Sequence, residues 1–327
     1  MRARRFGSTG LSVTPIGYGL AAVGRPGYIN LGRDEDLGDE RSVEAMERRA
    51  HQMLDAAYAG GIRYFDAARS YGRAEAFLGS WLNSKGLAPG DVTVGSKWGY
   101  TYVGEWRVDA KVHEVKDHSL QTLQQQIRES RGLLGEHLDL YQIHSATLES
   151  GVLDDKDVLA KLSSLRGEGL VIGLTTSGPR QAETIERALQ VEVDGVNPFG
   201  SVQSTWNLLE TSCGPALAEA HSRGWGVIAK EALANGRLTP HSTERDRAGL
   251  DRIAGAHGTT IDALALAAVV AQPWADMVLS GAVTVTQLES NLRALEVELD
   301  AAVLEELSGM AETPESYWEE RASLPWS

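Results

Sequence analysis

The sequence predicts an α/β protein in which eight parallel strands close into a (β/α)8 TIM barrel. Short apolar runs that favour strands alternate with longer segments that carry apolar residues at helical spacing, and the alternation repeats eight times. Because a connection between parallel strands needs a helix, this order predicts a parallel sheet. Eight units favour a closed barrel over an open sheet, and 327 residues suit one barrel domain over 1–327. No G-x-G-x-x-G motif follows the first strand, so a Rossmann domain is unsupported.

Composition limits the partners and the compartment of the chain. Hydrophobic residues make up 42% and charged residues 23%, and the net charge of −14 argues against nucleic acid or an anionic membrane as a partner. The single cysteine, Cys213, excludes an intrachain disulfide and is expected to start a helix as a small buried residue. The sequence has no metal-binding cluster of Cys and His. Residues 1–10 do not resemble a signal peptide and 264–271 is too short to span a bilayer, so we expect a cytoplasmic enzyme without a membrane partner.

The first elements can be assigned from turn residues and spacing. Residues 2–13 alternate around Ser8-Thr9-Gly10, which predicts a hairpin, and 14–19 form the first barrel strand. Residues 20–42 make a long Gly- and Asp-rich loop, which in a barrel overhangs the active face. Ser42 is the expected N-cap of the first helix.

The later part of the chain continues the alternation of strands and helices. Strands are expected at 64–66, 92–97, 138–145, 171–176, 202–204, 227–230 and 277–281. Helices are expected between 76 and 86 and at 119–134, 155–168, 179–190, 214–223, 245–272 with a break at Gly258, 286–292 and 299–310. The expected fold is thus a barrel with an N-terminal hairpin and extra C-terminal helices.

Four polar side chains stand at the C-terminal ends of predicted strands, where the active residues of such barrels lie. Asp66 ends the second strand and Tyr71 follows it, Lys97 ends the third, and His144 ends the fourth. A tyrosine has an ordinary pKa of about 10, so it acts as a general acid near neutrality only beside a cation. Lys97 offers that cation, and an anion can fix the lysine in place.

In type, order and spacing, these four residues resemble the catalytic tetrad of the aldo-keto reductases, and the resemblance extends from the first strand to the last helix. It implies that the hairpin caps the bottom of the barrel. It also implies an NAD(P)H-dependent oxidoreductase that reversibly reduces an aldehyde or ketone, such as a sugar. In this reaction Tyr71 donates the proton, Lys97 paired with Asp66 makes Tyr71 more acidic, and His144 orients the carbonyl oxygen.

The resemblance also places a nicotinamide cofactor across the barrel mouth. Members of the family hold the carboxamide with a Ser-Asn pair and a Gln, where this chain has Thr175, Thr176 and Gln203, so the pair departs from the pattern. Lys230 replaces an aromatic residue that stacks on the nicotinamide. Either Trp206 takes part of that role or the ring is held differently, and the alternative for Trp206 is simple packing.

The adenosine end is expected at the last strand and the helix after it, where backbone N–H groups suit an anion. The residues implied are Gly281, Thr284, Gln287 and Asn291. Gln287 stands where many members have an Arg for the 2′-phosphate. The resemblance nevertheless favours NADP(H), with NAD(H) not excluded.

Aromatic side chains with a polar handle can line a substrate pocket. We expect Tyr28, Trp98 and Trp106 there, with Trp98 near the chemistry because it follows Lys97; the alternative for these rings is packing of the loops onto the barrel. The tail carries Tyr317, Trp318 and Trp326, which in the family would fold over the substrate and otherwise only pin the tail.

Two other classes of function remain open from the sequence. One is a nucleotide-binding, redox-sensing subunit with little turnover, as some members of the family are. The other is a barrel lyase or isomerase that uses Lys97 as a Schiff-base amine. The sequence does not indicate an oligomeric state.

Overall fold

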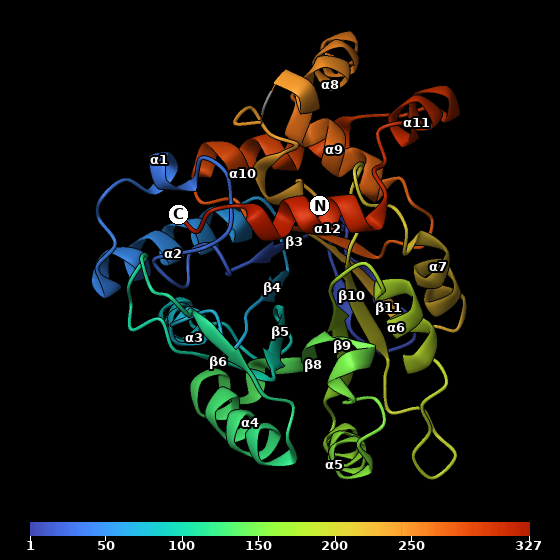
Figure 1. The fold of residues 1–327 in the computed structure, drawn as a ribbon. Helices are drawn as coiled ribbons and strands as arrows, with labels where there is room; N and C mark the ends of the chain where they lie inside the picture. Colours follow the sequence, from blue (N-terminus) through green and yellow to red (C-terminus); the bar gives the residue numbers. More distant parts are fainter. Residues whose placement is uncertain (243) are drawn as a thin grey trace.

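The structure is a computed structural model that describes residues 1–242 and 244–327. In this part of the chain eight parallel strands close into a barrel, and the predicted (β/α)8 TIM barrel is confirmed (Figure 1). Around the barrel the order is β3 (Ile16–Gly19), β4 (Tyr64–Asp66), β5 (Thr93–Trp98), β8 (Leu138–Ala146), β9 (Val171–Thr176), β10 (Ser201–Thr205), β11 (Gly226–Lys230) and β12 (Met277–Ser280). Closure comes from β12, which pairs with β3 through Val278 opposite Ile16 and Ser280 opposite Tyr18.

Large side chains fill the lower interior of the barrel. Tyr64, Leu140, Ile228 and Met277 pack there with Phe6 from the N-terminal hairpin. Glycines on neighbouring strands make the room. A Cβ on Gly95 would lie 2.2 Å from the Tyr64 hydroxyl, and one on Gly17 would lie 2.6 Å from the Met277 sulfur.

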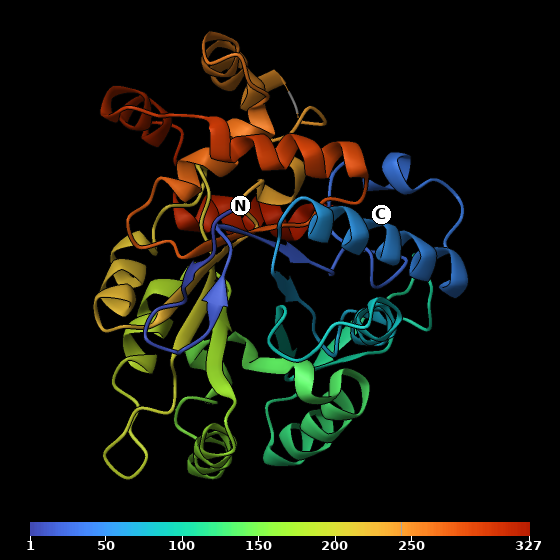
Figure 2. The same ribbon diagram turned by 180° about the vertical axis from the view of Figure 1, so that it is seen from behind.

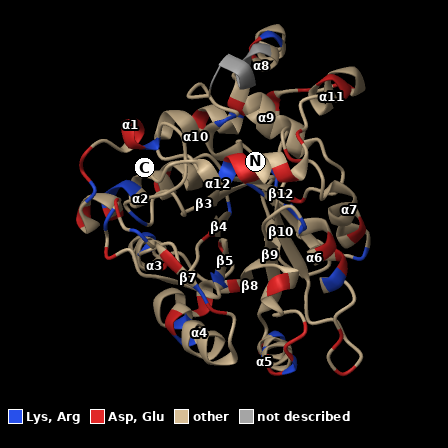
Figure 3. Cartoon of the chain, viewed as in Figure 1, with Lys and Arg blue, Asp and Glu red and all other residues tan. Residues whose placement is uncertain are grey.

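The outer helices follow the predicted order. They are α2 (Val43–Ala59), α3 (Ala74–Lys85), α4 (Leu120–Leu134), α5 (Lys156–Gly167), α6 (Gln181–Ala188), α7 (Gly214–Ser222), α8 (Glu244–Ala256), α9 (Ile261–Val270), α10 (Val285–Leu292) and α11 (Ala301–Ser308). Short 3-10 helices are η1 (Gly135–His137), η2 (Leu148–Ser150), η3 (Ala234–Gly236) and η4 (Arg293–Glu296). Ser42 caps α2 and Cys213 starts α7 as a buried residue, as predicted. Lys, Arg, Asp and Glu are spread over the outer helices (Figure 3).

Three segments contain elements that the sequence analysis did not predict. The loop at 20–42 holds α1 (Arg33–Leu37), the loop after β5 holds the antiparallel pair β6 (Tyr100–Tyr102) and β7 (Glu114–Lys116), and the tail holds α12 (Pro314–Ser323). These elements are short and lack a clear apolar period. Arg33 shows what holds such a segment: its buried guanidinium donates to the carbonyl oxygens of Ala22, Arg25 and Pro26.

The two ends of the barrel are closed differently. The predicted hairpin, β1 (Arg4–Arg5) with β2 (Ser12–Val13), lies at the bottom (Figure 2). The mouth at the other end is crossed by α12 (Figure 1). Among the described residues no single helix is long and apolar enough to cross a membrane; α8 and α9 pass that test only as a pair bent by 81°.

Candidate active site

A buried ion pair lies at the upper end of the barrel. Lys97 donates to a carboxylate oxygen of Asp66 and to the Ala67 carbonyl at 2.9 Å, and both charged side chains are at most 2% exposed. The other Asp66 oxygen accepts from the Tyr64 hydroxyl at 3.1 Å and from the Gln203 amide at 3.0 Å. The two opposite charges and the filled acceptor positions offset the cost of removing the pair from water.

Tyr71 and His144 lie above this pair. The Lys97 nitrogen is 4.7 Å from the centre of the Tyr71 ring, and the His144 ring meets the Tyr71 ring edge-on at 5.4 Å. Arg25 lies 5.6 Å from the same ring. The chain turns sharply after Tyr71 at Gly72, where φ is +61° and a Cβ would lie 2.6 Å from the Gly24 carbonyl oxygen. The structure therefore brings all four tetrad residues together, with the phenol held against the 20–42 loop.

The charges around Tyr71 differ from the expectation. Burial raises the pKa of the Tyr71 phenol well above its ordinary value, the Asp66 charge raises it further, and Arg25 opposes the shift. The predicted lowering by Lys97 does not dominate, because the charge of Lys97 is matched by Asp66. The phenol is therefore protonated near neutrality, and its raised pKa makes it a weaker acid while no ligand is bound.

His144 is held as a neutral imidazole. Burial lowers its pKa well below the ordinary value, and the nearby charges of Lys97, Lys230 and Arg25 lower it further. The Ser70 hydroxyl lies 3.3 Å from the Nδ1 atom of His144. When Ser70 donates to Nδ1, the ring proton is on Nε2, where it can be donated in a hydrogen bond without being lost.

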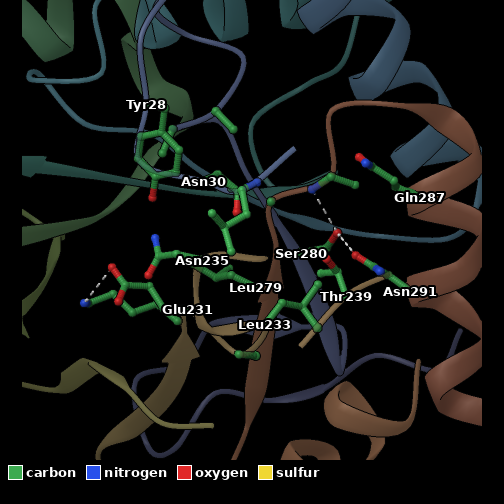
Figure 4. A pocket seen from close by; sticks show the side chains of 18 of the residues that line it. Tyr28, Asn30, Glu231, Leu233, Asn235, Thr239, Leu279, Ser280, Gln287 and Asn291 are labelled. Atoms are coloured by element: carbon green, nitrogen blue, oxygen red, sulfur yellow. Dashed lines mark hydrogen bonds and ion pairs between the residues drawn. The ribbon is translucent and has the colours of Figure 1, made fainter. Parts of the chain in front are cut away.

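A cavity of about 540 Å³ extends from this cluster to the start of α10. Its volume is that of a cofactor or ligand site. Figure 4 shows Glu231 on one side of it and Gln287 and Asn291 on the other. Predicted site residues that line it are Tyr28, Asp66, Tyr71, His144, Thr175, Gln203, Lys230, Gly281, Thr284, Gln287 and Asn291.

The start of α10 borders one end of the cavity, and its capping box uses three N–H groups: Val283 and Thr284 donate to the Gln287 side-chain oxygen, and Gln287 donates to the Thr284 hydroxyl. Thr284 caps α10, and a Cβ on Gly281 would meet no atom within 4 Å, so the backbone there faces open space. Asn291 is engaged inside the protein, accepting from Ser280 at 2.7 Å and donating to Asp262 at 2.8 Å. Gln287 donates to the Asp36 carboxylate at 2.5 Å. The open space beside Gly281 and the volume of the cavity can accommodate a dinucleotide, with Asp36 as a negative charge at its edge.

Two of the three aromatic residues predicted in the substrate pocket lie elsewhere. Successive side chains of a strand point to opposite faces, so Trp98 points away from the interior that Lys97 occupies. Its fully buried ring meets that of His118 at 5.6 Å. Trp106 packs against Phe77 at 6.2 Å, away from the cavity. Only Tyr28 of this group lines the cavity.

Two predicted cofactor residues are also outside the cavity. The Trp206 ring packs against Trp274 at 5.4 Å, so simple packing explains it. The Thr176 hydroxyl bonds with Ser204 at 2.6 Å within the protein, while the preceding residue, Thr175, faces the cavity. Because side chains alternate along a strand, Thr176 points away from the cavity that Thr175 faces.

Six charged residues of the cavity were missed by the sequence analysis: Arg25, Asp36, Glu114, Glu231, Asp262 and Arg321. Arg25 and Asp36 lie in the 20–42 loop, whose position over the mouth was predicted. Arg321 lies on α12 and donates to Glu231 through two guanidinium nitrogens, Nε at 2.7 Å and Nη2. No local pattern indicates this contact, because 90 residues separate its partners.

A protonated phenol and a neutral imidazole, set over a buried ion pair beside a long cavity, define a barrel equipped to move a proton to or from a bound ligand. The aldo/keto reductase family model matches residues 16–312, and the chain belongs to this family. Membership supports an oxidoreductase of carbonyls or alcohols that uses a nicotinamide cofactor.

Comparisons with individual proteins agree with the assignment. L-galactose dehydrogenase of Arabidopsis thaliana is 26% identical, with 94% of each chain covered. D-threo-aldose 1-dehydrogenase of a Pseudomonas species is 27% identical, covering 73% of this chain and 71% of that protein. An aldo-keto reductase of Bacillus halodurans, solved in a holo form, superposes with a TM-score of 0.73 at 20% identity, covering 96% of this chain and 97% of that one.

The ion pair leads to a stability prediction. Asp66→Asn leaves the Lys97 charge buried without a counter-charge, so we expect the free energy of unfolding to fall by about 3–5 kcal/mol. Urea unfolding followed by circular dichroism measures this, with Asp109→Asn in an exposed pair with Arg107 as the control that changes nothing measurable. The double variant Asp66→Asn/Lys97→Met should recover part of the loss; losses that simply add would mean that the two charges are not coupled.

Proposed function

We propose that this protein reversibly reduces an aldehyde or ketone with Tyr71 as the general acid. The observation that carries the proposal is the position of Tyr71 and His144 at one end of the cavity, directly over the Asp66–Lys97 pair. The nicotinamide, when bound, supplies the hydride. Tyr71 gives its proton to the substrate oxygen as negative charge develops there, and in the oxidative direction it takes that proton back.

The remaining site residues position the substrate and stabilise the charge that develops during the reaction. His144 donates a hydrogen bond to the substrate oxygen, and such a placed donor contributes on the order of 3 kcal/mol to lowering the barrier. The Asp66–Lys97 pair holds the floor of the site rigid and keeps an ammonium within 4.7 Å of the Tyr71 ring centre. As the phenolate forms, that ammonium stabilises it.

Asp36 bears on which nucleotide the protein uses. The family resemblance favours NADP(H) and implies that the 2′-phosphate faces Gln287. Gln287 donates to Asp36, a carboxylate that would repel a phosphate. We therefore propose that NAD(H) is used in preference to NADP(H) and that Asp36 decides the choice.

The alternatives have less support. Lys97 is paired with Asp66, and an ammonium has no lone pair with which to form a Schiff base, so a lyase mechanism through Lys97 is disfavoured. A redox-sensing subunit needs no acid at the cavity end, yet Tyr71 and His144 are both placed there. Two relatives are named as dehydrogenases of sugars, so sugars belong in any substrate panel.

The first prediction of this proposal concerns the acid. In Tyr71→Phe we expect the rate of nucleotide oxidation with a panel of aldehydes, ketones and sugars, followed at 340 nm, to fall at least about 100-fold because the proton donor is lost. Tyr58→Phe is the matched control, since Tyr58 packs against Trp81 outside the cavity. Fluorescence quenching should show that Tyr71→Phe still binds the nucleotide. Undiminished turnover in Tyr71→Phe would overturn the assignment of the acid, and nucleotide binding by the wild type without any turnover would favour the sensing subunit.

The second prediction concerns the nucleotide. Removing the Asp36 charge should raise the kcat/KM for NADPH relative to NADH by about tenfold. Asp36→Asn tests this, and Asp34→Asn on the same short helix, which does not line the cavity, is the control. An NADPH preference in the wild type that Asp36→Asn leaves unchanged would contradict the role of Asp36.

A further inference from the structure

Lys230, at the end of β11, is a half-buried cation, with its side chain 15% exposed, and it has no carboxylate of its own. Its nitrogen donates to the Thr205 hydroxyl at 2.8 Å, and the nearest carboxylate, Glu231, is 3.9 Å away. The Glu231 carboxylate already forms a bidentate salt bridge with Arg321. It also accepts a hydrogen bond from the Thr205 hydroxyl at 3.2 Å. The Lys230 charge is therefore only partly compensated within the protein.

The neighbouring cations are matched one to one. Arg25 pairs with Glu114 at 2.8 Å, and the Lys97 and Arg321 charges are matched by Asp66 and Glu231 as described above. Lys230 thus adds one positive charge to this end of the described cavity. An unmatched buried charge is costly, and an anionic ligand group can compensate it.

The backbone directs Lys230 and Glu231 to the same cavity. In an extended strand, two consecutive side chains would point to opposite faces. Here Glu231 has a φ of +53°, a left-handed conformation that costs free energy for a residue other than glycine, and both side chains line the cavity. Strain of this kind is commonly kept where a site needs it.

The height of Lys230 in the barrel fixes what it can reach. Lys230 is opposite Thr205 in the β10–β11 register, two residues beyond Gln203, which bonds to Asp66. At the rise of a strand, the backbone of Lys230 is about 7 Å further along the strand direction than the level of Gln203. A small molecule with its carbonyl at Tyr71 and His144 can therefore carry an anion that reaches Lys230.

We propose that Lys230 determines substrate specificity by binding a carboxylate of the carbonyl substrate, a few bonds from the reacting carbon. The substrate class is then an aldehyde or ketone that bears a carboxylate. This proposal rests on the proposed reductase function. Partial burial of Lys230 lowers its pKa to about 8, which agrees with a cation whose charge is only partly compensated until such a ligand binds.

Pairs of substrates that differ in one charge test the proposal. Succinic semialdehyde is compared with butanal, and 4-carboxybenzaldehyde with 4-methylbenzaldehyde, for wild type, Lys230→Met and Lys230→Arg. We expect the wild type to prefer the acid of at least one pair by about 10- to 100-fold in kcat/KM, the range for a hydrogen bond to a charged group. Lys230→Met should lose the preference mainly through KM, Lys230→Arg should keep most of it, and Lys161→Met on α5 is the control.

The pH dependence gives an independent readout. Lys230 is cationic below its pKa, so the wild-type preference for the acid in kcat/KM should decline as the pH rises through about 8, and Lys230→Met should show no such decline. A wild type that lacks the preference for both pairs overturns the proposal. Equal losses for acid and neutral substrates in Lys230→Met, with a raised dissociation constant for the nucleotide, also overturn it, because the anion bound is then a cofactor phosphate.

A failure of the reductase function can be distinguished from a failure of the carboxylate-binding proposal. If the wild type turns over no carbonyl, the dissociation constant of benzoate is measured by tryptophan fluorescence, with benzyl alcohol as the neutral probe. Benzoate binding that is lost in Lys230→Met supports the carboxylate site without the reaction. Benzoate binding that is absent, or equal in wild type and Lys230→Met, overturns it.

Discussion

The buried pair of Lys97 and Asp66 is the interaction on which the site depends. It joins β4 to β5, and the Gln203 amide ties it to β10 across the barrel. Because its two charges cancel, the pair forms a polar floor at little electrostatic cost to its surroundings. Tyr71 above it behaves as a buried phenol that retains its proton, and His144 beside it stays neutral. The candidate site therefore presents two uncharged side chains to the cavity.

Loops and the tail, rather than the strands, shape the ligand space. Arg25 lies over the rings of Tyr71, Tyr28 and Trp326, so it joins the catalytic end, the 20–42 loop and the tail in one cluster. On the other side the Arg321–Glu231 contact ties α12 to the end of β11. The barrel strands thus position the residues of the candidate site, while side chains from distant parts of the chain set the charge and width of the cavity.

The barrel, its strand order and the tetrad positions were predictable because they depend on periodicity and on where strands end. The prediction that Trp98 lies in the substrate pocket was wrong, although the same periodicity indicates its direction. Because Lys97 points into the barrel, the residue that follows it on the strand must point outward. The helix α12 was not predicted although Thr313 and Pro314 mark a helix start. Its place over the mouth could not be predicted, since its anchors, Tyr317 to Asn207 and Arg321 to Glu231, are contacts across about 100 residues. The positions of Asp36 and Arg25 in the cavity could not be predicted for the same reason, because their contacts join residues that are far apart in the sequence.

The cross-barrel contact between Gln203 and Asp66 has a consequence for the order of folding. These residues are 137 positions apart, and the barrel closes only where β12 meets β3. Long-range contacts carry a loop-closure entropy that must be met before they form. An open half-barrel has no partner for this amide, so the site cannot assemble ahead of the whole ring. During refolding, recovery of activity would accordingly mark ring closure and lag behind the recovery of helical structure.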